Sequence, residues 1–171
     1  CDWVFSEIYF AQYKFTTSID EFRAPERITI NYSKEKIDAT FHIQPISLLY
    51  ESGINPRTNI SEQMRQLLLW LDSKNRSNTL TFDLFALTFY YLSRYEEYLP
   101  FEPDSHGRFT SKNSLSHRFN LTSEPIIDKA FYYFFKQLED HSKYNKSHAI
   151  LKTLDIDMVY KYRGRGCIRT L

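Results

Sequence analysis

Two acidic residues near the C-terminal end carry the clearest chemical signal in this sequence. Asp155 and Asp157 follow a strand-like run over residues 150–154. Side chains two residues apart in a strand point to the same face, so both carboxylates are expected on one side. Two such charges repel each other, and a metal ion would relieve the repulsion. One carboxylate would then bind the metal while the other takes a proton from metal-activated water. Two solvated carboxylates at a strand end fit the same pattern.

A resemblance to a known family assigns roles to these acids. The segment Thr153-Leu154-Asp155-Ile156-Asp157 resembles the first motif of the polysaccharide deacetylases, carbohydrate esterase family four, which are metal-dependent hydrolases built on a distorted α/β barrel. The resemblance implies that Asp155 is the general base and Asp157 the first metal ligand, for a divalent, zinc-like ion in the intact parent protein. The two histidine ligands of the family stand four residues apart, and no two of the five histidines here do so. We therefore expect no cofactor in this chain and no deacetylase activity from it alone.

The resemblance extends over the preceding part of the chain. That part is similar to an uncharacterised domain that precedes the deacetylase-like barrel in proteins of Bacteroidetes-type bacteria. The run from Phe82 to Phe109 is its most specific stretch, including Asp104-x-His106-Gly107-Arg108-Phe109. The resemblance implies an accessory domain over residues 1–147, followed over residues 148–171 by the first strand and loop of a truncated deacetylase-like domain. The implied partners are the C-terminal barrel of the same polypeptide and a glycan.

A group of charged residues in the middle of the chain is a second candidate site. Two interpretations compete: a self-contained hydrolase or nuclease-like site in which the acids and the histidine transfer protons or bind a metal, and a charged network that holds a loop in place. The spacing allows an ion pair along one helix face and a guanidinium clamp on a carboxylate. Charged groups beside a buried aromatic helix need partners, which favours the structural interpretation. The residues are Arg94, Glu96, Glu97, Asp104, His106 and Arg108.

The tyrosine-rich stretch Phe89 to Tyr98 supports a third hypothesis, a carbohydrate- or protein-binding module. Tyrosine presents an apolar face with a polar tip, which suits stacking on sugars. Helical spacing distributes these rings around the helix axis, so most of them are expected in the core. The basic segment Lys161 to Gly166 holds only two Arg-Gly pairs, too few to predict an RNA-binding tail.

Composition limits the remaining possibilities. The chain has 171 residues, enough for one domain with a substantial core, and 17% aromatic residues argue for a packed globular fold. A formal net charge of +1 provides no field that favours nucleic acid. The two cysteines predict no disulfide framework, so a reducing, cytoplasmic location is the expectation. The longest uninterrupted apolar run, Leu67 to Leu71, is too short to predict a membrane segment.

The pattern of apolar residues predicts an α/β fold. Alternation predicts short strands at residues 13–17, 28–32 and 40–43, in a small mixed sheet with packed helices, and a C-terminal strand at about 148–155. Helical spacing predicts helices at residues 2–12, at 82–99 with Thr81 as N-cap, and from about Pro125. The helix at 82–99 is apolar on most sides and is therefore expected to be central and buried. Residues 64–71 fit a helix and a buried strand equally well.

Overall fold

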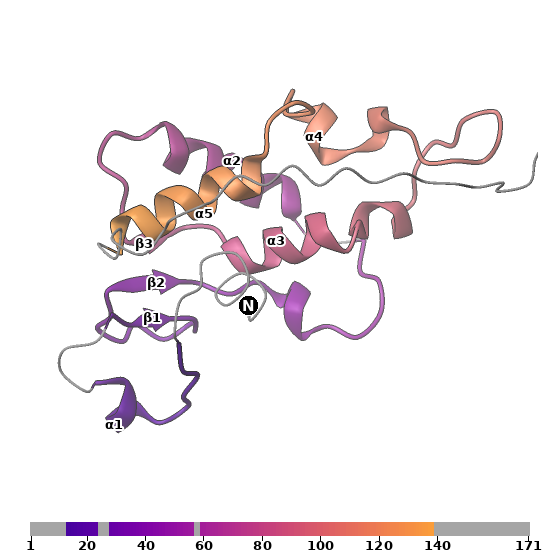
Figure 1. Ribbon diagram of the computed structural model, residues 1–171. Coiled ribbons are helices and arrows are strands. Elements are labelled where there is room, and N and C mark those ends of the chain that lie inside the picture. Colours follow the sequence, from indigo (N-terminus) through magenta and orange to yellow (C-terminus); the bar gives the residue numbers. More distant parts are fainter. Residues whose placement is uncertain (1–12, 24–27, 57–58, 139–171) are drawn as a thin grey trace, which may run out of the picture.

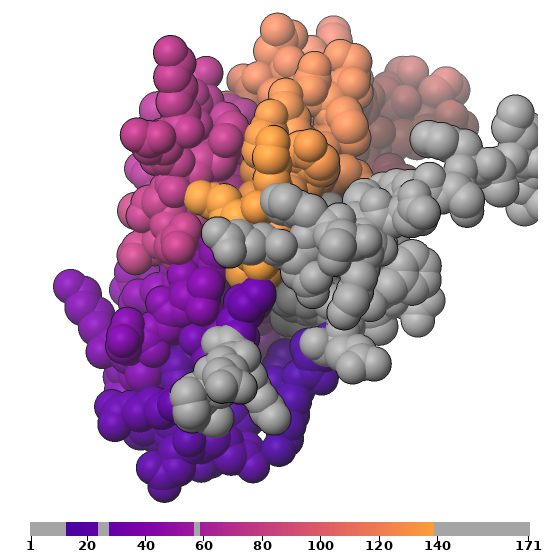
Figure 2. All heavy atoms as spheres, turned by 60° about the vertical axis from the view of Figure 1, so that its left-hand side comes forward, coloured from indigo at the N-terminus to yellow at the C-terminus, as the bar shows by residue number. Residues whose placement is uncertain are grey.

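The computed structural model describes residues 13–23, 28–56 and 59–138. These residues form an α/β fold in which a small sheet lies beside a layer of helices (Figure 1). The predicted helix at 2–12, the predicted strand at 148–155, and Asp155 and Asp157 lie outside the described residues. In the space-filling view the orange segment from α4 to α5 lies above the indigo N-terminal segments (Figure 2).

The sheet has three short parallel strands in the order β1-β2-β3. Ile30 of β1 pairs with Phe41 of β2, and Ile43 of β2 pairs with Leu80 of β3. Phe41 and Ile43 are fully buried and face the helices. The bounds are β1 Ile30–Asn31, β2 Phe41–Ile43 and β3 Thr79–Leu80.

This arrangement confirms the α/β class and the strands expected at 28–32 and 40–43, and it corrects two expectations. The described strands pair only in parallel, not in a mixed sheet, and α2 lies in the crossover between β2 and β3. Residues 13–17 form no strand. The polar side chains of that stretch instead fold back on helix α1 (Ile19–Phe22), where Lys14 and Thr16 both donate to the Glu21 carboxylate.

Helix α2 (Ile60–Asp72) resolves the ambiguous segment at 64–71 in favour of a helix. The Asn59 side chain caps it by accepting a hydrogen bond from the Glu62 N–H at 3.3 Å. Its buried residues recur at intervals of three or four, which places one apolar face in the core: Ile60, Met64, Leu67 and Trp70.

Helix α3 (Leu84–Leu92) is the central helix predicted for residues 82–99, but it is shorter. Asp83, not Thr81, is the N-cap, because its carboxylate accepts the Ala86 N–H at 2.9 Å, whereas the Thr81 hydroxyl donates to Gln66. The helix ends at Ser93 because Arg94 adopts a left-handed conformation with φ of 51°. A short 3₁₀ helix, η3 (Tyr95–Tyr98), then continues the chain.

Helix α5 (Ile126–Gln137) begins after Pro125, as predicted. It packs on α2 and α3, and it reaches the sheet through Phe134, whose ring centroid lies 4.8 Å from that of Phe41. Three further short elements complete the described fold: the 3₁₀ helices η2 (Ser47–Tyr50) and η4 (Ser111–Asn113), and helix α4 (Leu115–Arg118). Within the described residues, every helix is too short or too polar to cross a lipid bilayer.

Candidate functional site

The predicted ion pair between Arg94 and Glu97 is present at the end of α3. Arg94 lies at the break between α3 and η3, and most of its side chain is in solvent. An exposed ion pair of this kind contributes at most about 1 kcal/mol to stability. The pair between Arg94 and Glu97 is therefore a weak local contact at the start of η3.

Glu96 points in a different direction and binds a backbone group. Its Oε2 accepts a hydrogen bond from the Leu115 N–H at 2.7 Å. Leu115 is the first residue of α4, and its side chain is fully buried. A carboxylate at the N-terminus of a helix satisfies an unpaired N–H and interacts favourably with the helix dipole. Glu96 therefore fixes α4 against η3.

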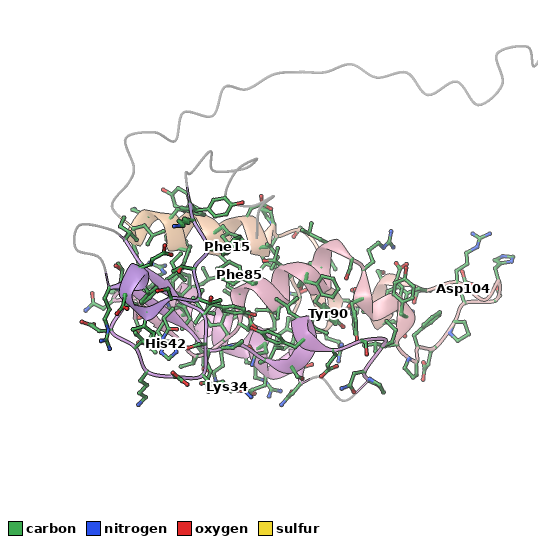
Figure 3. The ribbon with its side chains drawn as sticks, turned by 90° about the horizontal axis from the view of Figure 1, so that it is seen from below. Phe15, Lys34, His42, Phe85, Tyr90 and Asp104 are labelled. Atoms are coloured by element: carbon green, nitrogen blue, oxygen red, sulfur yellow. The ribbon has the colours of Figure 1, made fainter. Side chains whose placement is uncertain are left out.

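Asp104 organises the loop that contains His106 and Arg108. Its Oδ1 accepts hydrogen bonds from the His106 N–H at 2.8 Å and the Arg108 N–H at 2.9 Å. Two backbone hydrogen bonds, Gly107 N–H to Asp104 C=O and Asp104 N–H to Arg108 C=O, close the turn at 3.0 Å each. Gly107 has φ of 76°, which glycine adopts without strain. Figure 3 shows Asp104 on a loop that extends away from the helices.

The six residues therefore do not form one site. Glu97 is paired with Arg94, Glu96 with the Leu115 backbone and Asp104 with its own turn, while the His106 side chain is exposed. The Arg108 guanidinium does not form the expected ion pair with a carboxylate among the described residues. The loop is held instead by the backbone N–H and C=O of Arg108. The same part of the chain contains no group of three His, Cys, Asp or Glu side chains that would hold a metal ion.

A hub at Asp83, which the sequence analysis did not single out, links several elements. The carboxylate is fully buried and accepts hydrogen bonds from the Tyr32 hydroxyl at 2.8 Å and the Ile46 N–H at 2.9 Å, besides its helix cap. The Asp83 N–H donates to Gln63 Oε1 at 2.6 Å. Burial, and then the negative charge of Asp83, raise the pKa of Tyr32. An acidic residue directly before a largely apolar helix was the available signal.

The tyrosine-rich stretch is divided between core and surface. Tyr90 and Tyr95 are buried, and their ring centroids lie 5.7 Å apart. The Tyr90 hydroxyl is buried without a hydrogen-bond partner among the described residues, and burial, followed by the charge of Glu96, raises its pKa. Tyr91 is half-buried and accepts a hydrogen bond from the Ser116 hydroxyl, whereas Tyr98 is exposed. This distribution leaves little room for a row of stacking rings.

Large apolar side chains remain exposed on one face beside α3. Along the stripe of α3 that starts at Phe85, exposure rises from 7% at Phe85 to 41% at Phe89 and 59% at Leu92. Tyr50 of η2, which is 68% exposed, stacks on Tyr32 with ring centroids 6.5 Å apart, and Tyr32 contacts Phe85 edge-on. We call Tyr50, Phe89 and Leu92 the apolar face.

Comparison with known proteins places this chain in a family. Residues 1–143 match the model of a family of unknown function, DUF7033. The chain belongs to DUF7033. Searches of the curated proteins and of the solved structures found no match.

The DUF7033 match covers every described residue, including the Asp83 hub, the apolar face and the loop at Asp104. Asp155 and Asp157 follow the matched region. The expected resemblance to an uncharacterised domain is therefore confirmed over residues 1–143, and the family description assigns no activity to it.

Proposed function

We propose that this DUF7033 domain is a non-catalytic accessory domain of a polysaccharide deacetylase-like protein, and that its apolar face packs against the catalytic part of the same polypeptide. The apolar face is the observation that carries the proposal. A group of large apolar side chains left in water on a well-packed scaffold is typical of an interaction surface.

The apolar face is prepared for association. Phe89 and Leu92 project from α3, whose other side is fixed in the core by Leu84, Ala86 and Leu87, each fully buried. Because the helix is already rigid, docking would order few additional groups. Removing a fully exposed large apolar side chain from water contributes about 1.5 to 3 kcal/mol, and these partly exposed residues would contribute a fraction of that each.

The arrangement of charged groups supports a non-catalytic role for the described residues. Glu96, Glu97 and Asp104 each hold a local backbone or ion-pair contact, which gives each carboxylate a structural use. In the proposal, catalysis belongs to the parent protein, where the resemblance assigns Asp155 as general base and Asp157 as metal ligand.

The proposal is tested by reconstituting the complex from two separately produced parts. The wild-type 171-residue chain should bind a deacetylase-like catalytic domain from the same polypeptide, measured by isothermal titration calorimetry. The double variant Phe89→Gln/Leu92→Gln should bind at least about tenfold more weakly, which corresponds to about 1.4 kcal/mol. Its unfolding free energy should fall by no more than about 1 to 2 kcal/mol, because Phe89 is 41% and Leu92 59% exposed.

Leu69→Gln is the matched control, since Leu69 is 66% exposed on α2 and lies outside the apolar face. This variant should bind as the wild type does. If the two parts do not associate, or if the double variant and the control bind equally well, the proposal is wrong.

A further inference from the structure

We propose that the surface formed by the loop at Asp104, η4 and α4 binds an anionic polysaccharide. Residues 105–123 contain Arg108, Lys112 and Arg118 and no Asp or Glu. All three side chains are exposed, and none forms an ion pair within the part of the chain that the structure describes. His106 and His117 are exposed on the same segment. We call Arg108, Lys112 and Arg118 the basic edge.

The backbone that presents the basic edge is held in one conformation. At the base of the loop, the Asn113 side chain accepts a hydrogen bond from the Glu102 N–H at 3.2 Å and donates one to the Glu102 C=O at 2.8 Å. The rings of Phe101 and Phe109 pack edge-on at the base of the loop, with their centroids 5.1 Å apart. At the tip, Asp104 holds the turn, and the loop projects from the fold (Figure 1). A surface organised in advance loses less entropy on binding.

The nearby acids Glu96, Glu102 and Asp104 equal the three cations in formal charge, but of these acids only Glu102 is exposed, whereas all three cations are. The carboxylates of Glu96 and Asp104 both accept hydrogen bonds from backbone N–H groups, whose dipoles offset some of their negative potential. Glu102 is exposed at the base of the loop. The exposed cations follow one another along three consecutive elements, which suits an extended polymer better than a single small anion.

The character of the surface favours a hydrophilic polymer over a protein. From residue 99 to residue 131 no large apolar side chain is exposed. Protein interfaces normally have an apolar or aromatic centre, which this surface lacks. Its exposed groups are guanidinium, ammonium, imidazole and hydroxyl donors, which suit carboxylates and sugar hydroxyls.

A nucleic acid fits less well. Tight nucleic-acid binding needs many phosphate contacts and, for single strands, exposed aromatic rings on which bases stack. The basic edge has three permanent cations and no exposed aromatic ring, and the whole chain has a formal net charge of only +1. A polysaccharide with more widely spaced carboxylates therefore matches this surface better.

Calorimetric titration of the 171-residue chain with sodium polygalacturonate tests the inference. We expect saturable binding at low ionic strength that weakens as salt is added, because exposed charges are screened. The triple variant Arg108→Gln/Lys112→Gln/Arg118→Gln should bind at least about tenfold more weakly, since three exposed charge contacts are lost. The control Lys34→Gln/Lys36→Gln/Lys74→Gln removes the same charge from exposed positions elsewhere and should bind as the wild type does.

Double-stranded DNA, poly-L-glutamate and neutral amylose complete the design. Weaker binding of all three than of polygalacturonate supports the inference. Absence of polygalacturonate binding, an equal loss in both triple variants, or tighter binding of DNA or polyglutamate overturns it. Circular dichroism and thermal unfolding verify that both variants fold. No catalytic domain is used, so this outcome is separate from that of the proposed function.

Discussion

Asp83 is the buried carboxylate on which the packing of several described elements depends. Replacing it with alanine should lower the free energy of unfolding by about 2 to 4 kcal/mol, because the Tyr32 hydroxyl and the Ile46 and Ala86 N–H groups all lose their acceptor. Urea unfolding followed by tryptophan fluorescence measures the change. Asp104→Ala is the control: it removes a carboxylate that also accepts two backbone hydrogen bonds, but on a projecting loop, and should cost no more than about 1 kcal/mol. Equal losses would show that Asp83 does not link the elements.

The partly buried Tyr32 and the buried Tyr90 should respond differently to loss of the hydroxyl group. Tyr32→Phe should destabilise by about 1 kcal/mol because Asp83 loses a donor. Tyr90→Phe should be neutral or stabilising by up to about 1 kcal/mol, since the Tyr90 hydroxyl is buried without a partner among the described residues. Chemical denaturation at pH 7 measures both. A clear loss of stability in Tyr90→Phe would contradict this expectation.

These two tyrosines and Tyr91 predict how stability depends on alkaline pH. Burial is the main cause that raises the pKa of Tyr32, Tyr90 and Tyr91. The unfolded chain releases these protons near pH 10, while the folded chain retains them. Stability is therefore fully present below about pH 10 and falls as pH rises above that value. Thermal unfolding between pH 8 and pH 11 should show this decline, and Tyr90→Phe should make it shallower.

At the scale of elements, the contact between Glu96 and α4 gives a test of its structural role. Glu96→Ala should accelerate hydrogen exchange of the Leu115 amide and the rest of α4, because the Leu115 N–H loses its acceptor. Glu97→Ala should leave α4 exchange unchanged, since Glu97 contacts Arg94. Exchange followed by mass spectrometry distinguishes the two variants. Similar exchange in both would remove Glu96 as the anchor of α4.

Helix α5 and strand β2 were predicted correctly because their apolar periodicity is also their packing. Strand β1 was predicted in position but not in packing, since it buries Asn31 and leaves Ile30 only partly buried. The pattern at 13–17 failed because alternation does not supply a neighbouring strand, and Glu21 satisfies those polar side chains instead. The break at Arg94 depends on a left-handed residue that propensity does not indicate, and β3 is only two residues long.

The candidate site was predictable in its residues but not in its contacts. The spacing of Arg94 and Glu97 indicated their ion pair because both lie on one local turn. Glu96 reaches a backbone group nineteen positions away, and the Tyr32 hydroxyl reaches Asp83 across fifty-one positions. Such contacts arise from tertiary packing, so a single sequence cannot indicate them.

For the whole molecule, the described fold separates two kinds of surface. The apolar face lies over η2 and the second half of α3, and the basic edge follows the loop at Asp104, η4 and α4. The Asp83 hub fixes the start of α3 to the start of η2, while Glu96 fixes α4 against η3. Two surfaces with separate anchors can be changed independently, which is why their variants discriminate between the two proposals.

The metal response of the whole chain tests the accessory role. A ligand that binds only the folded protein must raise its melting temperature. In the accessory proposal the histidine ligands belong to the barrel of the parent protein, so addition of zinc at a tenfold molar excess should leave the melting temperature within about 1 °C of its value in EDTA. Asp155→Asn should be equally neutral by differential scanning calorimetry. A rise of several degrees with zinc that Asp155→Asn or Asp157→Asn abolishes would mean that this chain binds the metal itself, and the non-catalytic assignment would then be wrong.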